Sequence, residues 1–336
     1  MNDKVRTESV MIQNLCVPCN CHCRYCLLSW NGKPVGTSWE RGKEAGLRLM
    51  KEIKEEYPDL DLSFTFGYSM EHPDLREAIN FLKSIGSIQS EYLQCDGLRM
   101  RNEQECEELA SLMSEEGVRS LNFTFYGLKE YHDRFAGRNG DFDLMIQMMV
   151  SAIKNGLNVS SGVPLTKENA ATVDELIDVL KKNGCNKISL FIPHEEGRGA
   201  TLANVRLEED DLSLLSNESK QLMNRKIYKT ESEWLANEYS EESRRAIIIS
   251  LRYDNIDRYE KMDGVSLLHE IEELDEKYYS SFPDFTELAA LYGNPDSKKL
   301  YRIRDLAYHY RKLYTEEFKL NIYDVTDERR SGSRRY

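Results

Sequence analysis

Residues 9–26 read SVMIQNLCVPCNCHCRYC, and this stretch decides how the rest of the chain is interpreted. It begins with an apolar, strand-like run over 9–15 and continues into a loop that holds five of the eight cysteines. Within the loop, Cys19, Cys23 and Cys26 follow the spacing C-x3-C-x2-C, and Tyr25 precedes the last of them. Three thiolates so close together can hold three corners of one inorganic centre. One corner of a four-iron cluster would then remain open to a further ligand.

The cysteine loop has more than one chemical interpretation. The chain starts MNDKVRTESV without the apolar region of a signal peptide, so we expect reduced thiols rather than disulfides. Zinc sites usually combine two separated ligand pairs, and no second pair follows here, although Cys16, Cys21 or His22 can supply a fourth ligand. Short-spaced cysteines favour an iron–sulfur cluster. A zinc-stabilised α/β protein remains the alternative at this point.

Composition and charge narrow the class of protein further. The 336 residues are 40% hydrophobic and 31% charged, as in ordinary globular proteins, and no apolar run approaches the length of a membrane span. The net charge of −13 argues against a broad nucleic-acid surface, because phosphate binding needs a basic face. We therefore expect a cytoplasmic protein with no membrane partner and no nucleic-acid partner.

Short apolar or β-branched runs alternate with helical patterns through the first 200 residues. The six runs cover 9–15, 62–66, 92–95, 120–126, 157–165 and 187–192. The helices expected after the first five runs cover 39–57, 73–85, 103–116, 142–155 and 168–183. Such alternation indicates βαβ units and a parallel sheet. We expect an α/β fold that curls into a partial (β/α)6 TIM-like barrel, with the cysteine loop at the C-terminal ends of the strands, where sites form.

The pattern changes after residue 200. Helices are expected over 208–225, 231–248, 267–279 and 298–318. We therefore divide the chain into a core barrel over 1–200 and a mainly helical C-terminal region over 201–336. This region is expected to cover the barrel mouth, because reactive chemistry there would have to be kept from water.

The cysteine loop resembles the signature of the radical SAM superfamily, C-x3-C-x-aromatic-C, in every fixed position. The resemblance implies one [4Fe-4S] cluster on Cys19, Cys23 and Cys26, with S-adenosyl-L-methionine (SAM) at the open iron. Cys16 and Cys21 are spare in this assignment. Members with SPASM or twitch extensions hold auxiliary clusters on C-terminal cysteines, and no cysteine follows Cys185 here.

Later strand ends resemble the SAM-binding elements of the family only in part. Gly67 is retained where relatives carry G-G-E-P, but Tyr68 and Ser69 replace the acid and the proline, so backbone carbonyls would have to serve. The segment 123–127 resembles the family's S-x-D-G element, with Thr124 keeping the hydroxyl and Tyr126 replacing the acid. The cofactor contacts that the resemblance implies are Tyr25, Gly67, Tyr68, Ser69, Asp96, Thr124, Ser161, Ile192 and Arg198.

The resemblance also implies a reaction. A radical SAM enzyme reductively cleaves SAM at its cluster and uses the 5′-deoxyadenosyl radical to abstract hydrogen from a substrate, here a peptide or a small molecule. Flavodoxin or ferredoxin is the expected electron donor. If the product radical must be reduced, Cys95 at a strand end is our candidate catalytic thiol. A non-catalytic protein that binds SAM and the cluster on the same barrel is the alternative.

Overall fold

The computed structural model describes residues 7–26, 33–67, 69–195, 197–236 and 245–321. All pairings between its strands are parallel, in the orders β2-β1-β7 and β3-β4-β5-β6. The strands are β1 (Thr7–Gln13), β2 (Asp61–Thr65), β3 (Tyr92–Gln94), β4 (Ser120–Thr124), β5 (Asn158–Pro164), β6 (Lys187–Phe191) and β7 (Arg245–Ser250). The first six lie within two residues of the predicted runs, and the predicted partial barrel is confirmed.

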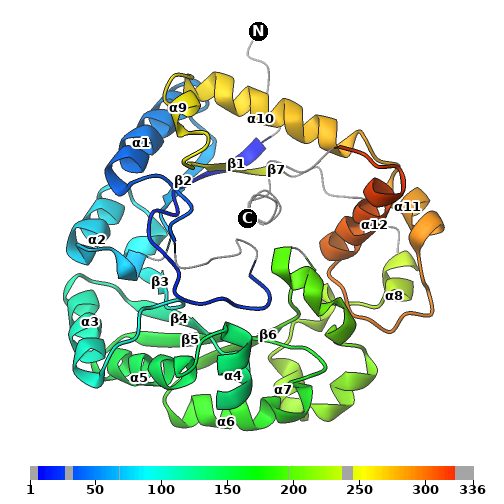
Figure 1. Ribbon diagram of the computed structural model, residues 1–336, viewed down its shortest axis with the longest axis horizontal. Helices are drawn as coiled ribbons and strands as arrows, with labels where there is room; N and C mark the ends of the chain where they lie inside the picture. The colour runs from blue at the N-terminus through cyan, green and yellow to red at the C-terminus, as the bar shows by residue number, and fades with distance from the viewer. Residues whose placement is uncertain (1–6, 27–32, 68, 196, 237–244, 322–336) are drawn as a thin grey trace.

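Helices surround the curved sheet on its outer side (Figure 1). Those of the core are α1 (Trp39–Glu56), α2 (Leu75–Ser84), α3 (Glu103–Glu115), α4 (Lys129–Ala136), α5 (Asp141–Lys154) and α6 (Val173–Lys182). The later ones are α7 (Asn217–Gln221), α8 (Glu231–Leu235), α9 (Ile256–Tyr259), α10 (Gly264–Tyr279), α11 (Phe285–Tyr292) and α12 (Ile303–Glu317). Helices α11 and α12 lie on the side of the ring between β6 and β7 (Figure 1).

The helix predicted over 231–248 is wrong at its C-terminal end. The residues there form β7, which pairs with β1 so that Ile247 lies opposite Val10 and Ile249 opposite Ile12. Three consecutive isoleucines favour a strand, since their branched side chains pack well on a pleated surface. The partner strand lies more than 200 residues earlier in the chain, so local pattern alone misled the prediction. The division at residue 200 stays a prediction, although β7 belongs to the same sheet as β1.

The long helix predicted over 208–225 is also wrong. The structure has short turns there instead, namely the 3₁₀ segments η5 (Asp210–Leu214) and η6 (Arg225–Ile227) on either side of α7. The start of the helix predicted over 168–183 is replaced by the 3₁₀ segment η3 (Ala170–Thr172). Helix α4 lies in a stretch that the sequence did not assign to a helix. Within the described ranges, no helix is both long enough and apolar enough to cross a membrane.

Removing the core side chain of β7 is expected to destabilise the whole barrel. Ile249 is 1% exposed and packs in the core that β1, β2 and α1 share. We expect Ile249→Ala to lower the free energy of unfolding by about 2–5 kcal/mol, because truncating a buried isoleucine loses apolar burial and leaves a cavity. Urea unfolding followed by circular dichroism measures this. The control is Tyr253→Ala, at a side chain that is 62% exposed. Equal effects of the two substitutions would contradict the placement of β7.

The two faces of the sheet differ in polarity at β4. In β4, Leu121 and Phe123 pack in the core against the outer helices. The alternate side chains Asn122 and Thr124 belong to the opposite, inner face, because successive side chains of a strand point to opposite sides. Asn122 donates to the Ser160 hydroxyl of β5 across that face (2.8 Å). The inner face thus carries hydrogen-bonding groups where barrels of this type usually pack branched apolar side chains.

Candidate functional site

The cysteine loop follows β1 and is held by backbone hydrogen bonds to the ends of other elements. The N–H of Asn20 donates to the carbonyl of Gly97 after β3 (2.9 Å), and the N–H of His22 donates to the last carbonyl of α4 (2.7 Å). The N–H of Arg198, in the 3₁₀ segment η4 (Gly197–Val205) after β6, donates to the carbonyl of Cys26 (3.1 Å). The loop therefore lies at the C-terminal edge of the strands, as predicted, and crosses the ring in Figure 1.

Four cysteines of this loop gather in one place. Cys19 and Cys21 are buried together, and Cys23 and Cys26 pack against them. The side chain of Cys21 hydrogen-bonds with those of both Cys19 and Cys23. Cys16 packs instead against the core of β1 and β2. The sequence therefore missed that Cys21 is a direct neighbour of the predicted ligands, because spacing alone does not show which side of a loop a thiol occupies.

The thiol set fits a positively charged inorganic centre. Hydrogen bonding to Cys21 together with burial raises the pKa of Cys19, and the same two causes raise the pKa of Cys23. Neighbouring thiolates repel one another, so the three thiols oppose joint ionisation by themselves. Bound iron would remove that repulsion, since coordination deprotonates a thiol outright. Within the described ranges, no three His, Cys, Asp or Glu side chains are grouped closely enough for a single metal ion.

Tyr25 lies among aromatic rings from three elements. Its ring is edge-on to Tyr126 after β4 (centroids 5.6 Å apart) and tilted against Phe135 of α4 (5.8 Å) and Phe191 of β6 (6.4 Å). Burial raises the pKa of Tyr25 far above its usual range, so the phenol stays protonated. The residue before the last cysteine thus joins the loop to the inner face of the barrel.

Asp96 and Thr124, which were each predicted as cofactor contacts, are brought together. The N–H and hydroxyl of Thr124 donate to the two carboxylate oxygens of Asp96 (2.9 and 2.8 Å), and Gln94 donates to the second oxygen. Burial raises the pKa of Asp96 to about 7, although the hydrogen bonds from Thr124 and Gln94 favour the charged form. This group presents a carboxyl to the inner face at the ends of β3 and β4.

Gly67 and Arg198 also lie beside the cysteine loop. Gly67 has a positive φ of 32° and approaches the backbone of Leu15, which explains a glycine after β2. One terminal nitrogen of Arg198 is buried without a hydrogen-bond partner among the described residues. A buried guanidinium nitrogen in this state suits an anionic ligand such as a carboxylate. Tyr68 and the side chain of Ser69 lie outside the described part of the structure.

Three predicted site residues lie on the other face of the sheet. Cys95 is fully buried in the outer core, near Cys106 of α3. Ile192 belongs to the same outer core. Ser161 alternates with core valines of β5, and its hydroxyl donates only to the adjacent carbonyl of Gly162 (3.3 Å). The period of two along a strand points these side chains towards the helices, so their predicted roles at the site find no support in their placement. Cys95 in particular is not placed to return a hydrogen atom to a substrate.

The sequence analysis did not predict the site residues on the inner face that directly precede Ile192 and Ser161. Phe191 precedes Ile192 and contacts Tyr25, and Ser160 precedes Ser161 and pairs with Asn122. Tyr126 was noted only as a departure from the family pattern, yet its hydroxyl lies 3.1 Å from the sulfur of Cys23. The alternation of apolar and polar residues in β4 and β5 was the signal that could have identified this face.

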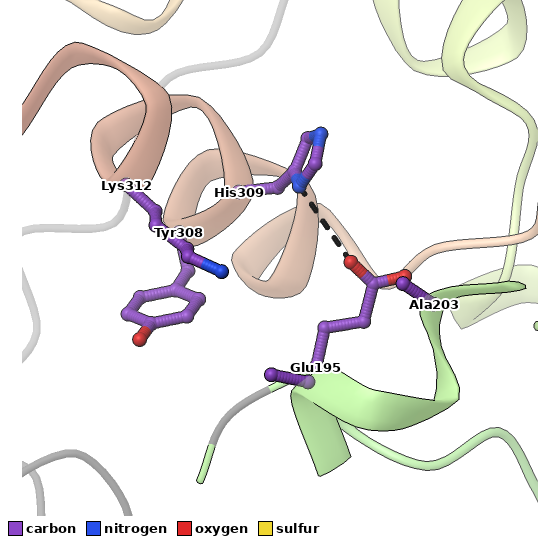
Figure 2. A pocket seen from close by; sticks show the side chains of 6 residues that line it. Glu195, Ala203, Tyr308, His309 and Lys312 are labelled. Atoms are coloured by element: carbon purple, nitrogen blue, oxygen red, sulfur yellow. Dashed lines mark ion pairs between the residues drawn. The ribbon is translucent and has the colours of Figure 1, made fainter. Parts of the chain in front are cut away.

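A second polar group links the end of β6 to α12. The imidazole of His194 lies 2.5 Å from the carboxylate of Asp305, and the buried guanidinium of Arg206 stacks on Tyr301 (4.1 Å). The carboxylate of Glu195 lies 3.6 Å from the imidazole of His309 (Figure 2). Both line a cavity of about 70 Å³ that is completed by Ala200, Ala203, Tyr308 and Lys312. These contacts join α12 to the barrel on the side where no strand lies between β6 and β7 in the described structure.

The fold and the cysteine loop together define a parallel β/α barrel with a three-cysteine motif at its C-terminal edge. The family model described as the Radical SAM superfamily matches residues 14–190, which is more than half of the chain. The chain belongs to the radical SAM superfamily, and the predicted family is confirmed. A [4Fe-4S] cluster and SAM are accordingly its cofactors, as the cysteine motif predicted.

Individual relatives are distant. Fe-coproporphyrin III synthase of Methanosarcina barkeri (strain Fusaro / DSM 804) is 22% identical over 214 residues, which cover 64% of this chain and 49% of that protein. The chain thus matches about half the length of this curated relative. Streptococcus suis SuiB bound to precursor peptide SuiA has a TM-score of 0.51 and 10% identity, with 74% and 59% of the two chains covered. Coproporphyrinogen III oxidase (HemN) from Escherichia coli has a TM-score of 0.39 and 12% sequence identity. The match covers 92% of this chain and 91% of that chain.

Proposed function

We propose that the chain is a radical SAM enzyme that holds its cluster on Cys19, Cys23 and Cys26 and abstracts hydrogen from a peptide or small-molecule substrate. The observation that carries the proposal is the position of these three thiols. They lie together at the C-terminal edge of a parallel barrel, beside an inner face of hydrogen-bonding side chains. The bound cofactors would supply one-electron cleavage of SAM and, with it, a hydrogen-abstracting radical.

The residues of the chain would position SAM and exclude water from it. Gly67 lets the backbone approach a ligand, the free guanidinium nitrogen of Arg198 suits a carboxylate, and Asp96 with Thr124 offers polar groups for a ribose or an amine. Tyr25 and Phe191 add aromatic surface beside the loop. Helix α12, joined to the end of β6, is proposed to shield this edge from solvent.

Both substrate classes have support. The solved structure of SuiB holds a precursor peptide, which supports a peptide substrate, whereas the name of the curated relative supports a small molecule. The polar inner face suits a substrate with hydrogen-bonding groups in either case. An electron donor such as flavodoxin or ferredoxin is part of the proposal, because the reaction consumes an electron.

Anaerobic turnover tests the proposed reaction. The protein is reconstituted with iron and sulfide, reduced with dithionite and incubated with SAM. We expect 5′-deoxyadenosine, quantified by liquid chromatography with mass spectrometry, and about four irons per chain. A Cys23→Ala variant treated in the same way is the control for cleavage that does not depend on the cluster. SAM binding with a full iron load but no 5′-deoxyadenosine above this control would contradict the enzyme and favour the non-catalytic alternative.

A further inference from the structure

The hydroxyl of Tyr126, which follows β4, touches a predicted cluster ligand. It lies 3.1 Å from the sulfur of Cys23, and the residue is only 4% exposed. In the thiol form either atom can be the donor. An iron-bound Cys23 is a thiolate without a proton, so only the phenol can then donate.

The backbone of Tyr126 is hydrogen-bonded to a buried pair of residues, His132 and Asp141. The N–H of Tyr126 donates to Nδ1 of His132 (3.2 Å), so this nitrogen carries no proton. The other ring nitrogen therefore bears the hydrogen and donates to Asp141 (3.0 Å). His132 is 0% exposed and Asp141 is 2% exposed, and the Tyr126 ring stacks on Phe135 with centroids 4.7 Å apart. The phenol is thus held in place by its backbone and its ring before any cluster binds.

We propose that Tyr126 tunes the reduction potential of the cluster by donating a hydrogen bond to the sulfur of Cys23. This inference rests on the proposed function, which makes Cys23 a cluster ligand. Reduction adds negative charge that the ligand sulfurs share, so a donor at the sulfur stabilises the reduced state more than the oxidised state. Tyr126 is therefore a positioning residue that makes the electron easier to accept. The site where the family pattern has an acid carries a donor here, and an acidic side chain would act in the opposite direction.

The test is a potentiometric titration of the reconstituted full-length protein, monitored by the EPR signal of the reduced cluster. Tyr126→Phe removes the donor and keeps the ring. We expect a lower midpoint potential, so that the reduced fraction at the wild-type midpoint falls from one half to roughly a tenth, about a tenfold change in a one-electron equilibrium. Tyr131→Phe is the matched control, because that hydroxyl bonds to Thr166 (3.1 Å) and Glu168 and not to a cysteine.

A second variant controls for any change in the packing of the Tyr126 ring. Replacing Tyr126 by 3-fluorotyrosine keeps the ring and hydroxyl but makes the phenol a stronger donor, so the midpoint potential is expected to rise. Iron content is measured on each sample, which separates failure of this inference from failure of the cluster assignment itself. Wild-type potentials in fully loaded phenylalanine and fluorotyrosine variants would overturn the proposal. If the phenylalanine variant does not load iron, an unchanged potential in the fluorotyrosine variant is enough to overturn it.

Discussion

Single replacement of Cys19, Cys23 or Cys26 by alanine is expected to abolish iron loading, whereas Cys21→Ala is expected to keep it. All four thiols lie in one cluster of side chains, so Cys21 is close enough to be an alternative ligand. The predicted spacing assigns it no iron, and its sulfur lies 3.7 Å from both oxygens of the Asp141 carboxylate. A bound cluster loses one of its three anchors in each of the first three variants but none in Cys21→Ala.

Iron and sulfide per chain after anaerobic reconstitution are the measurement, with 5′-deoxyadenosine formation as the second readout. We expect both to fall at least about tenfold in the three ligand variants, in line with the loss of direct metal ligands. Cys16→Ala is a further control, because Cys16 packs in a different core. Loss of iron in Cys21→Ala as complete as in Cys19→Ala would show that the ligand set is assigned wrongly.

Gly97→Ala is expected to prevent cluster binding although it leaves all three predicted ligand residues unchanged. Gly97 follows β3 with a φ of +67°, and a methyl group there would overlap the sulfur of Cys19 and approach its Cβ to 3.2 Å. Iron–sulfur bonds tolerate displacements of only about 0.2 Å, and a clash of this size demands more. The Cys19 side chain would have to leave its position, so iron loading should fall as far as it does in Cys19→Ala.

Gly117→Ala is the matched control for this prediction. Gly117 also has a positive φ, +75°, but a Cβ there would meet nothing within 4 Å. Both substitutions carry the cost of a left-handed backbone, about 1–2 kcal/mol, and only Gly97→Ala adds the contact with Cys19. Thermal unfolding reports the shared cost, and iron per chain reports the difference. Equal iron loading of the two variants would contradict the inference that Cys19 needs the close approach of Gly97 to hold iron.

The site residues that could be predicted from the sequence are those that lie close together in the chain or at the ends of neighbouring strands. Cys19, Cys23 and Cys26 lie within eight residues of one another, so their spacing alone indicated a shared centre. The end of β1 directs that loop to the edge of the barrel where neighbouring strands also end. Asp96 and Thr124 could be predicted for the same reason, because parallel strands place their C-terminal ends side by side.

The inner and outer faces of the strands were harder to assign. Ser161 and Ile192 were predicted as site residues because they lie at strand ends. The residues that face inwards are the preceding ones, Ser160 and Phe191. A shift of one position moves a side chain to the other face of a sheet. β4 alternates apolar and polar residues, whereas β7 has three consecutive isoleucines, as is common in parallel strands that are buried on both faces.

The sequence by itself determined the cysteine motif, the parallel β/α order and the edge of the barrel at which the site forms. These depend on local spacing, turn residues and hydrophobic pattern, which need no distant partner. Only the tertiary structure decided that β7 extends the sheet beside β1, that Cys21 packs with the three predicted ligands, and that Tyr126 reaches the sulfur of Cys23. Each of these depends on contacts between segments or side chains whose mutual orientation is set by packing, and packing is not encoded in any one stretch of the chain.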